Sequence, residues 1–209
     1  MIVKAVGLQK QFNHKVLFEE FNLSVREGDS FVIAGESGSG KTTLLNLLSL
    51  IEKPDAGQIF WREKEIKKVN TRLTNKIIRE EIGYLFQNYA LIDNATVEEN
   101  IEIGLKYRKD TKNKAQLVEE ALEKVGLSNF QKRKIYSLSG GEQQRVALAR
   151  IIVKPCAIIF ADEPTGNLDE ENSKKIMDIL FELNQEGKAI VVVTHDLEHL
   201  DRFEQIIEL

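Results

Sequence analysis

The sequence contains little cysteine, proline and histidine, and it lacks a long hydrophobic run. Its 209 residues include one cysteine, Cys156, and three prolines. A single cysteine cannot form a disulfide within the chain, and the start MIVKAVGLQK lacks the apolar core and the cleavage site of a signal peptide. The longest apolar stretch, residues 151–161, is interrupted by Lys154 and Pro155 and is too short to span a bilayer. These absences predict a cytoplasmic protein that does not insert into the membrane.

The composition is that of a folded protein with a small excess of acidic over basic residues. Hydrophobic residues make up 42% of the chain, charged residues 30%, and the formal net charge is −4. This apolar content excludes a disordered chain. A globular chain of this size buries roughly 70% of its unfolded surface. The acidic balance argues against a dedicated nucleic-acid binder, because affinity for polyanions rests on excess positive charge.

Short apolar segments alternate with helical ones along the chain. We predict strands at 2–6, 16–25, 31–34, 58–61, 157–161 and 189–193, helices at 42–51 and 172–184, and a last helix and strand ending at Leu209. Residues 88–153 are mostly helical, with capping-box spacing at Thr96 to Glu99 and at Ser139 to Glu142. Apolar strands separated by helices predict an α/β fold with a mainly parallel sheet covered on both faces.

We expect one domain over residues 1–209. Its β layer and the first part of its core cover about 1–87, a helical subdomain about 88–153, and the second part of the core about 154–209. No repeat, low-complexity tract or linker divides the sequence.

Residues 35–42, GESGSGKT, match the phosphate-binding P-loop and lie between a predicted strand and a predicted helix. Gly35, Gly38 and Gly40 let the backbone turn its N–H groups inward, and the helix N-terminus adds a positive dipole end. Lys41 supplies a charge for the β- and γ-phosphates, and the Thr42 hydroxyl is placed to bind Mg²⁺. A glycine-serine turn with a chance Lys-Thr is the alternative, and the strand and helix on either side disfavour it.

Polar residues follow three other apolar strands. Asp162 and Glu163 end one strand, Gln87 follows residues 82–86, and His195 follows 189–193. Acids after a strand are often only helix caps, but beside a P-loop they suit metal binding by Asp162 and activation of water by Glu163. In a parallel sheet the carboxyl ends of strands meet at one edge, so we expect Lys41 and these side chains to converge there.

The hexapeptide Leu138-Ser-Gly-Gly-Glu-Gln143 is absent from ordinary P-loop kinases and GTPases. Together with the P-loop, Gln87, the 162–163 acids, residues 167–169 (Asn-Leu-Asp) and His195 in this order, it resembles the ABC-type ATPases over essentially the whole chain. The resemblance implies a P-loop NTPase core of RecA type, an N-terminal antiparallel β layer and an inserted helical subdomain. It further implies ATP hydrolysis with Mg²⁺.

The resemblance also implies the residues of the site. Phe12, where many relatives have Tyr, would stack on adenine. Glu163 would act as the catalytic base, assisted by His195, Gln87 and Lys41. Thr42, Gln87 and Asp162 would bind Mg²⁺. The nucleotide contacts would be Phe12, Gly35, Glu36, Ser37, Gly38, Ser39, Gly40, Lys41, Thr42, Thr43, Ser139, Gly140, Gly141, Glu142 and Asp169. In such ATPases the signature 138–143 and Asp169 act on the nucleotide of a second copy, so we expect a head-to-tail homodimer with ATP.

Within the ABC ATPases, residues 86–101 and 161–169 resemble the group that serves lipoprotein release, macrolide and peptide export, bacteriocin export and cell division. This likeness implies a separate multi-span permease, with the ATPase on the cytoplasmic face of the cell membrane. Tyr89 and Leu91 are candidates for contact with the permease, although both suit a core equally. The basic runs 62–79, 106–114 and 132–134 fit either solvated surface or a face toward anionic lipid headgroups or acidic permease loops.

Two other classes compete with a transport ATPase. A soluble ABC protein of translation or DNA repair usually carries two ATPase modules or a long coiled coil, and no sustained heptads are present here. A P-loop kinase or GTPase is disfavoured by the signature and by Glu163.

Overall fold

A five-stranded parallel sheet forms the centre of the molecule. The computed structural model describes residues 1–12, 15–108, 113–166, 168–196 and 198–209. The parallel strands have the order β6-β7-β8-β3-β9. They are β3 (Ser30–Ala34), β6 (Ile82–Leu85), β7 (Ile158–Asp162), β8 (Ala189–Thr194) and β9 (Gln205–Glu208). Strands β3, β7 and β8 are buried throughout, which explains why their sequences are continuously apolar.

A second, antiparallel sheet covers one side of the molecule, with strand order β2-β1-β4-β5. Its strands are β1 (Val3–Phe12), β2 (Lys15–Val25), β4 (Ala56–Trp61) and β5 (Lys64–Glu65). β1 runs well past the expected end at residue 6, because register shifts after Ala5 and Val6 carry it through Gly7 while its pairing continues.

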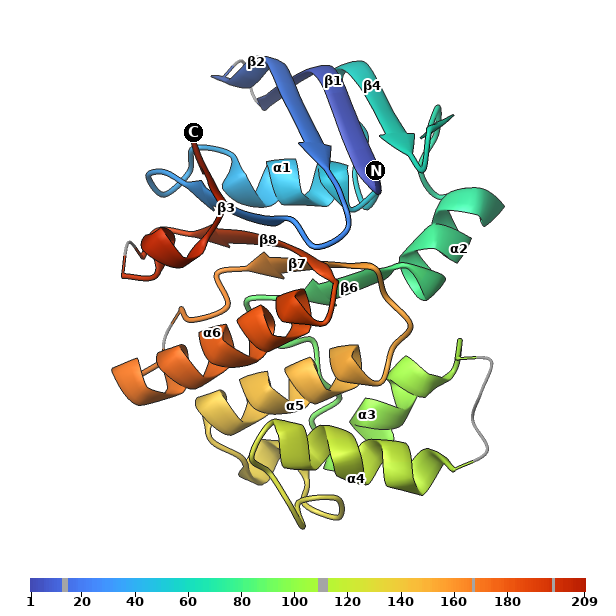
Figure 1. The fold of residues 1–209 in the computed structure, drawn as a ribbon, viewed down its shortest axis with the longest axis vertical. Helices are drawn as coiled ribbons and strands as arrows, with labels where there is room; N and C mark the ends of the chain where they lie inside the picture. The colour runs from blue at the N-terminus through green and yellow to red at the C-terminus, as the bar shows by residue number, and fades with distance from the viewer. Residues whose placement is uncertain (13–14, 109–112, 167, 197) are drawn as a thin grey trace.

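Helix α1 (Lys41–Leu48) lies between the two sheets, and the other face of the parallel sheet is covered by α6 (Glu170–Gln185) and α5 (Gly140–Ile152) (Figure 1). Helices α3 (Val97–Leu105) and α4 (Lys114–Lys124) pack beyond α5, and α2 (Arg72–Glu80) projects at the edge. The apolar residues form one buried cluster around α1 and another around α5 and α6. The expected α/β fold with a parallel core sheet, an antiparallel layer and helices is confirmed. Within the described residues, no helix is both long and apolar enough to cross a membrane.

Several expected elements differ in the structure. The helix expected at 42–51 ends at Leu48, because Leu50 has a left-handed backbone with φ 63° and turns the chain. The last helix expected before Leu209 is only a 3₁₀ turn, Leu200–Arg202, in the described part of that segment. Helix α2 was not expected, because its short sequence was interpreted only as a run of basic residues. In the structure it is amphipathic and begins with a capping box between Thr71 and Thr74. The capping boxes at Thr96 and Ser139 are confirmed.

Gly57 and Gly28 form a matched pair that tests the close approach of β1 and β4. Their φ values are +89° and +80°, but a Cβ at Gly57 would lie 2.3 Å from the carbonyl oxygen of Gly7, whereas one at Gly28 meets nothing within 4 Å. We expect Gly28→Ala to lower the free energy of unfolding by about 1 kcal/mol and Gly57→Ala by about 2 to 4 kcal/mol. Urea unfolding followed by circular dichroism measures both losses. Equal losses would contradict the packing described here.

Candidate functional site

The loop 35–40 connects β3 to α1 and curls around the amine of Lys41. Lys41 is buried, and its Nζ donates to the carbonyl oxygens of Gly35 and Glu36, each at 2.8 Å. A Cβ at Gly35 would lie 2.4 Å from the carbonyl oxygen of Leu209, so only glycine fits there. The hydroxyl of Ser39 is buried without a hydrogen-bond partner among the described residues. Helix α1 begins with no side-chain cap, which leaves its first N–H groups for a ligand.

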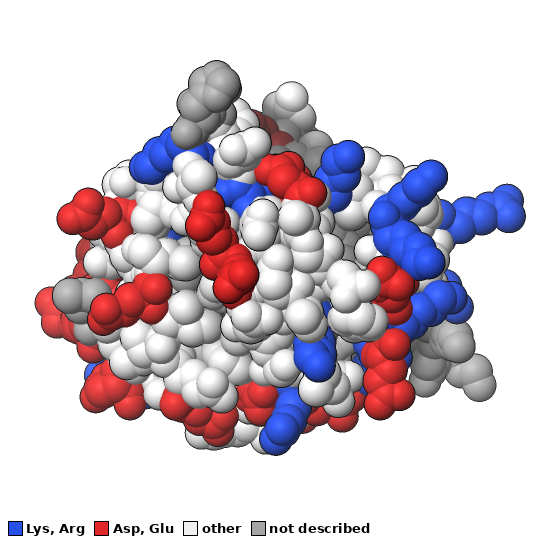
Figure 2. Space-filling model, turned by 90° about the horizontal axis from the view of Figure 1, so that it is seen from above, with Lys and Arg blue, Asp and Glu red and all other residues white. Residues whose placement is uncertain are grey.

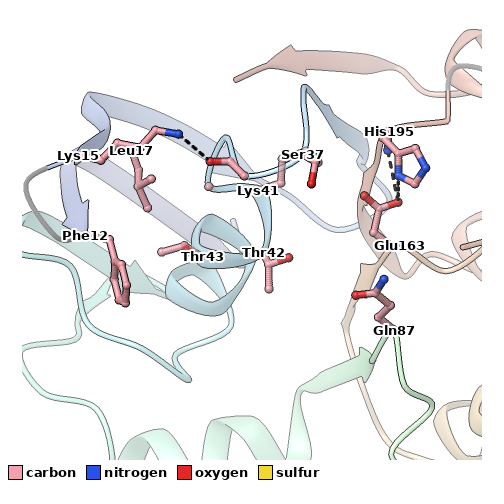
Figure 3. A pocket seen from close by; sticks show the side chains of 12 residues that line it. Phe12, Lys15, Leu17, Ser37, Lys41, Thr42, Thr43, Gln87, Glu163 and His195 are labelled. Carbon is pink, nitrogen blue, oxygen red and sulfur yellow. Dashed lines mark hydrogen bonds and ion pairs between the residues drawn. The ribbon is translucent and has the colours of Figure 1, made fainter.

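A pocket of about 650 Å³ opens beside this loop, at the carboxyl ends of the parallel strands (Figure 3). It brings together four of the residues that were expected to converge, Lys41, Gln87, Glu163 and His195, and Asp162 adjoins it through a second hollow that shares Gln87. The lining residues are Phe12, Lys15, Leu17, Ser37, Gly38, Gly40, Lys41, Thr42, Thr43, Gln87, Glu163 and His195. Of the other expected loop residues, Gly35 and Glu36 contribute the carbonyls that hold Lys41, and Ser39 contributes its buried hydroxyl.

Thr42 and Asp162 meet across the site. The Thr42 hydroxyl donates to Asp162 Oδ1 at 2.9 Å, which joins the start of α1 to the end of β7. Burial raises the pKa of the Asp162 carboxyl above its ordinary value, and the nearby Glu163 charge adds to this, whereas the bond from Thr42 and the charge of Lys41 lower it. A hydroxyl and a carboxylate side by side are hard oxygen ligands of the kind that Mg²⁺ takes together with waters and phosphate oxygens. The donor set therefore fits that ion.

Glu163 and His195 form a pair at the far side of the pocket from Phe12 (Figure 3). Glu163 Oε2 lies 2.8 Å from His195 Nδ1 and 3.3 Å from the backbone nitrogen of His195, which donates to it. The Glu163 side chain is 13% exposed and that of His195 is 67% exposed. Glu163 has a left-handed backbone with φ 47°, and its N–H donates to the carbonyl of Val193. Strain of this kind in a non-glycine residue is typical of functional sites.

Phe12 lies at the end of β1 on the pocket wall, and the residue is 65% exposed. Lys15 and Leu17 of β2 line the same end, and Lys15 Nζ donates to the carbonyl of Gly38 at 3.1 Å. Neither residue was expected from the sequence. Their only signal is that they follow Phe12 on the next strand of a hairpin, and that signal depends on knowing that β1 extends as far as Phe12.

The signature does not line this pocket in the described structure. Ser139 caps α5, its hydroxyl accepting from the N–H of Glu142 at 3.3 Å, while the Glu142 carboxylate accepts from the N–H of Ser139 at 2.8 Å. The packing around the two glycines is close: a Cβ at Gly140 would lie 3.0 Å from the Tyr89 hydroxyl, and one at Gly141 would lie 2.7 Å from the Asn172 side chain. A larger residue at either position would therefore have to displace the Tyr89 or the Asn172 side chain.

Asp169 also lies outside the pocket, at the N-terminus of α6. It accepts from the backbone and the side chain of Asn172 at 2.8 and 2.7 Å, and these bonds lower its pKa. Arg145 of α5 donates to the same Asn172. Asp169 and the signature are thus joined into one unit. This unit and the loop before α1 both lie on the left of the molecule in Figure 1, so one face presents both.

Comparisons with known proteins agree with this geometry. Residues 18–166 match the ABC transporter family. The chain is 38% identical over its full length, and 93% of the relative's, to the lipoprotein-releasing system ATP-binding protein LolD of Aquifex aeolicus. It is 33% identical to the macrolide export ATP-binding/permease protein MacB of Pectobacterium atrosepticum, covering all of this chain and 33% of MacB.

Solved structures show the same likeness. The dimeric ATP-binding cassette MJ0796 bound to ADP and Pi superposes with a TM-score of 0.89 at 36% identity, covering 100% of this chain and 94% of that one. CbiO1 of Clostridium perfringens, part of the transporter complex cbiONQ, has a TM-score of 0.81 at 29% identity, over 93% of this chain and 78% of its own. The chain belongs to the ABC transporter family, as an ATP-binding subunit of the LolD and MacB type.

Proposed function

We propose that this chain binds ATP and hydrolyses it to ADP and phosphate, and that hydrolysis powers a separate membrane permease. The observation that carries the proposal is that Lys41, Thr42, Gln87 and the Glu163–His195 pair line one pocket, with Asp162 bonded to Thr42 beside it. In this assignment the loop 35–43 holds the phosphates, and Phe12 stacks on adenine through its exposed ring. Thr42, Asp162 and Gln87 hold Mg²⁺, which would draw negative charge from the phosphate oxygens.

Glu163 acts as the base. Its carboxylate takes a proton from a water molecule whose oxygen bonds to the γ-phosphorus, while the bond from that phosphorus to the bridging oxygen breaks and ADP leaves. His195 orients Glu163 through Nδ1, and a doubly protonated ring also has an Nε2–H for the γ-phosphate. Gln87 positions the water, and the Lys41 ammonium offsets charge on the phosphates.

The site is completed by a second copy of the chain. Ser139, Gly140, Gly141, Glu142 and Asp169 lie outside their own pocket, at the starts of α5 and α6, and Gly141 and Asp169 both lie against Asn172. A head-to-tail dimer would place this group on the partner's γ-phosphate, where the N-terminus of α5 supplies N–H donors. Because catalysis here is mainly positioning and charge stabilisation, hydrolysis depends on dimer closure.

A groove of about 290 Å³ between α2 and α3 is the proposed site for a cytoplasmic helix of the permease. Ile51 and Ile103 are among its apolar residues, and Arg79, Arg150 and Lys154 add positive charge. Phe86 and Ala90, next to Gln87, also line it, whereas the candidates Tyr89 and Leu91 pack against the apolar core. The groove therefore touches the segment that enters the ATP pocket.

The basic runs have different surroundings. Lys132 pairs with Glu98, and Lys134 donates to the carbonyl of Asn94, so both ammonium groups have partners within the chain. Basic side chains gather on one side in Figure 2, the side where β5 and α2 lie in Figure 1. Arg72, Lys76 and Arg79 share one face of α2, and Arg79 reaches the groove. This face suits acidic permease loops or anionic headgroups. Residues 109–112 of the run 106–114 lie outside the described residues.

The proposal for the transport step draws on the names of the relatives. LolD is named for lipoprotein release and MacB for macrolide export. We propose that this chain serves export of a peptide, lipid or drug-like substrate, or mechanotransmission, from the cytoplasmic face of the membrane. We further propose the division into a core and a helical subdomain at about residues 88–153. The alternative function is that of a soluble ABC ATPase without a permease.

The substitution Glu163→Gln tests the assignment of the base. The amide cannot take the proton from water but keeps the size of the side chain, so we expect ATP affinity to stay while turnover falls by roughly 100-fold or more. ATP should then trap a dimer that light scattering detects. Glu186→Gln, far from the pocket, is the control and should hydrolyse ATP normally. Undiminished turnover in Glu163→Gln would falsify the base assignment.

A pair of exposed isoleucines tests the groove. Ile51, 40% exposed, lines the groove, and Ile206, 50% exposed, lies on β9 away from it. We expect Ile51→Glu to lose copurification of a multi-span membrane protein from native membranes, because a charge would be buried at the contact. Ile206→Glu should retain it. Equal recovery with both variants would sink the groove assignment, and no membrane protein with the wild type would favour the soluble alternative.

A further inference from the structure

The backbone between Gln87 and α3 is held in an unfavourable conformation. Tyr89 and Ala90 have φ values of 62° and 48°, consecutive left-handed positions that residues with a Cβ avoid. Two short turn bonds, from the Tyr89 N–H to Phe86 and from the Ala90 N–H to Asn88, close the turn locally. These local bonds use the N–H groups and leave both carbonyls of the left-handed residues pointing to a common partner.

That partner is the guanidinium of Arg150. Its Nη1 donates to the carbonyl of Ala90 at 2.5 Å, and its Nη2 donates to the carbonyl of Tyr89 at 2.9 Å. In the described part of the chain, no carboxylate pairs with Arg150, and burial lowers its pKa. A rigid fork with two parallel donors can hold two successive carbonyls at once, which a lysine ammonium on a flexible stem does less well. Arg150 thus stabilises the turn that fixes the direction of Gln87.

Arg150 belongs to α5, the helix that begins at the signature. The same turn touches α5 a second time, because the Tyr89 hydroxyl lies 3.0 Å from the position of a Cβ at Gly140. The segment after Gln87 therefore lies close to α5 near its start and is hydrogen-bonded to it near its end. A rigid shift of α5 would move the segment with it.

We infer that Arg150 is a positioning residue that links Gln87 in the chain's own ATP pocket to the signature helix, which acts in the site of the second copy. The inference rests on the proposed function, since only a composite site gives α5 a role in the partner. When the signature of one copy engages the partner's nucleotide, α5 carries the Arg150 fork and the turn, and Gln87 follows. Closure of the partner's site thereby places Gln87, the side chain that positions water, in the chain's own site.

The substitution Arg150→Lys keeps the charge and removes the fork. We expect kcat to fall by about 10- to 100-fold, because a small misplacement of a positioned group has an effect of that size. The ATP concentration for half-maximal binding should change less than about twofold, since Arg150 lies outside the pocket lining. Arg108→Lys is the control, because Arg108 donates to the carbonyl of Val153 at the end of the same helix and has no bond to the turn.

A double-mutant cycle with Gln87→Ala separates positioning from general structural damage. If Arg150 acts through Gln87, Arg150→Lys should lower the single-turnover rate of hydrolysis of labelled ATP by less than about twofold in the Gln87→Ala background. Additive losses, or a wild-type rate in Arg150→Lys, would overturn the inference. Tyr89→Phe removes only the hydroxyl over Gly140, and its smaller loss should also vanish in that background, which keeps the test decisive if Arg150→Lys folds poorly. A wild-type chain without ATPase activity would instead refute the proposed function.

Discussion

Parallel pairing of β6, β7, β8 and β3 is the constraint on which the site depends. Leu85 pairs with Ala161, Asp162 with Val193, and Ala34 with Thr194. With this register, each strand ends within one or two residues of a polar group at the same edge. The phosphate loop, Gln87, the acids 162–163 and His195 therefore meet without any long connecting segment. Because β3, β7 and β8 are buried throughout, their side chains pack on both faces of the sheet, and a slip by one residue would disrupt the packing on both.

The proposed second half of the composite site lies at helix starts rather than at strand ends. Ser139 and Glu142 cap α5, Asp169 caps α6, and Asn172 joins the two starts. Close packing also favours glycine in the signature, since a Cβ at Gly141 would lie 2.7 Å from the Asn172 side chain. The same contacts that hold the helix starts together present them as one surface. Structural and functional demands on these residues are thus satisfied by one arrangement.

Local patterns predicted the fold class and the meeting of Lys41, Gln87, Glu163 and His195, because the P-loop, the acids 162–163 and the strand ends are patterns of neighbouring residues. The sequence could not predict features set by distant partners. Helix α2 was missed since its apolar face is short, and β1 was cut at residue 6 because the bulge at Gly7 depends on pairing with β2 and β4. Lys15, Leu17 and Arg150 belong to no motif. Their positions follow only from contacts with residues 20 or more positions away along the chain.

In the composite site that we propose, each copy of the chain holds only part of the catalytic groups. The most direct measurement is the ATPase rate per subunit over a range of protein concentrations, with light scattering recording monomer and dimer in the same samples. We expect the rate per subunit to rise with concentration and to follow the dimer fraction. A full rate per subunit in samples that contain only monomer would contradict it.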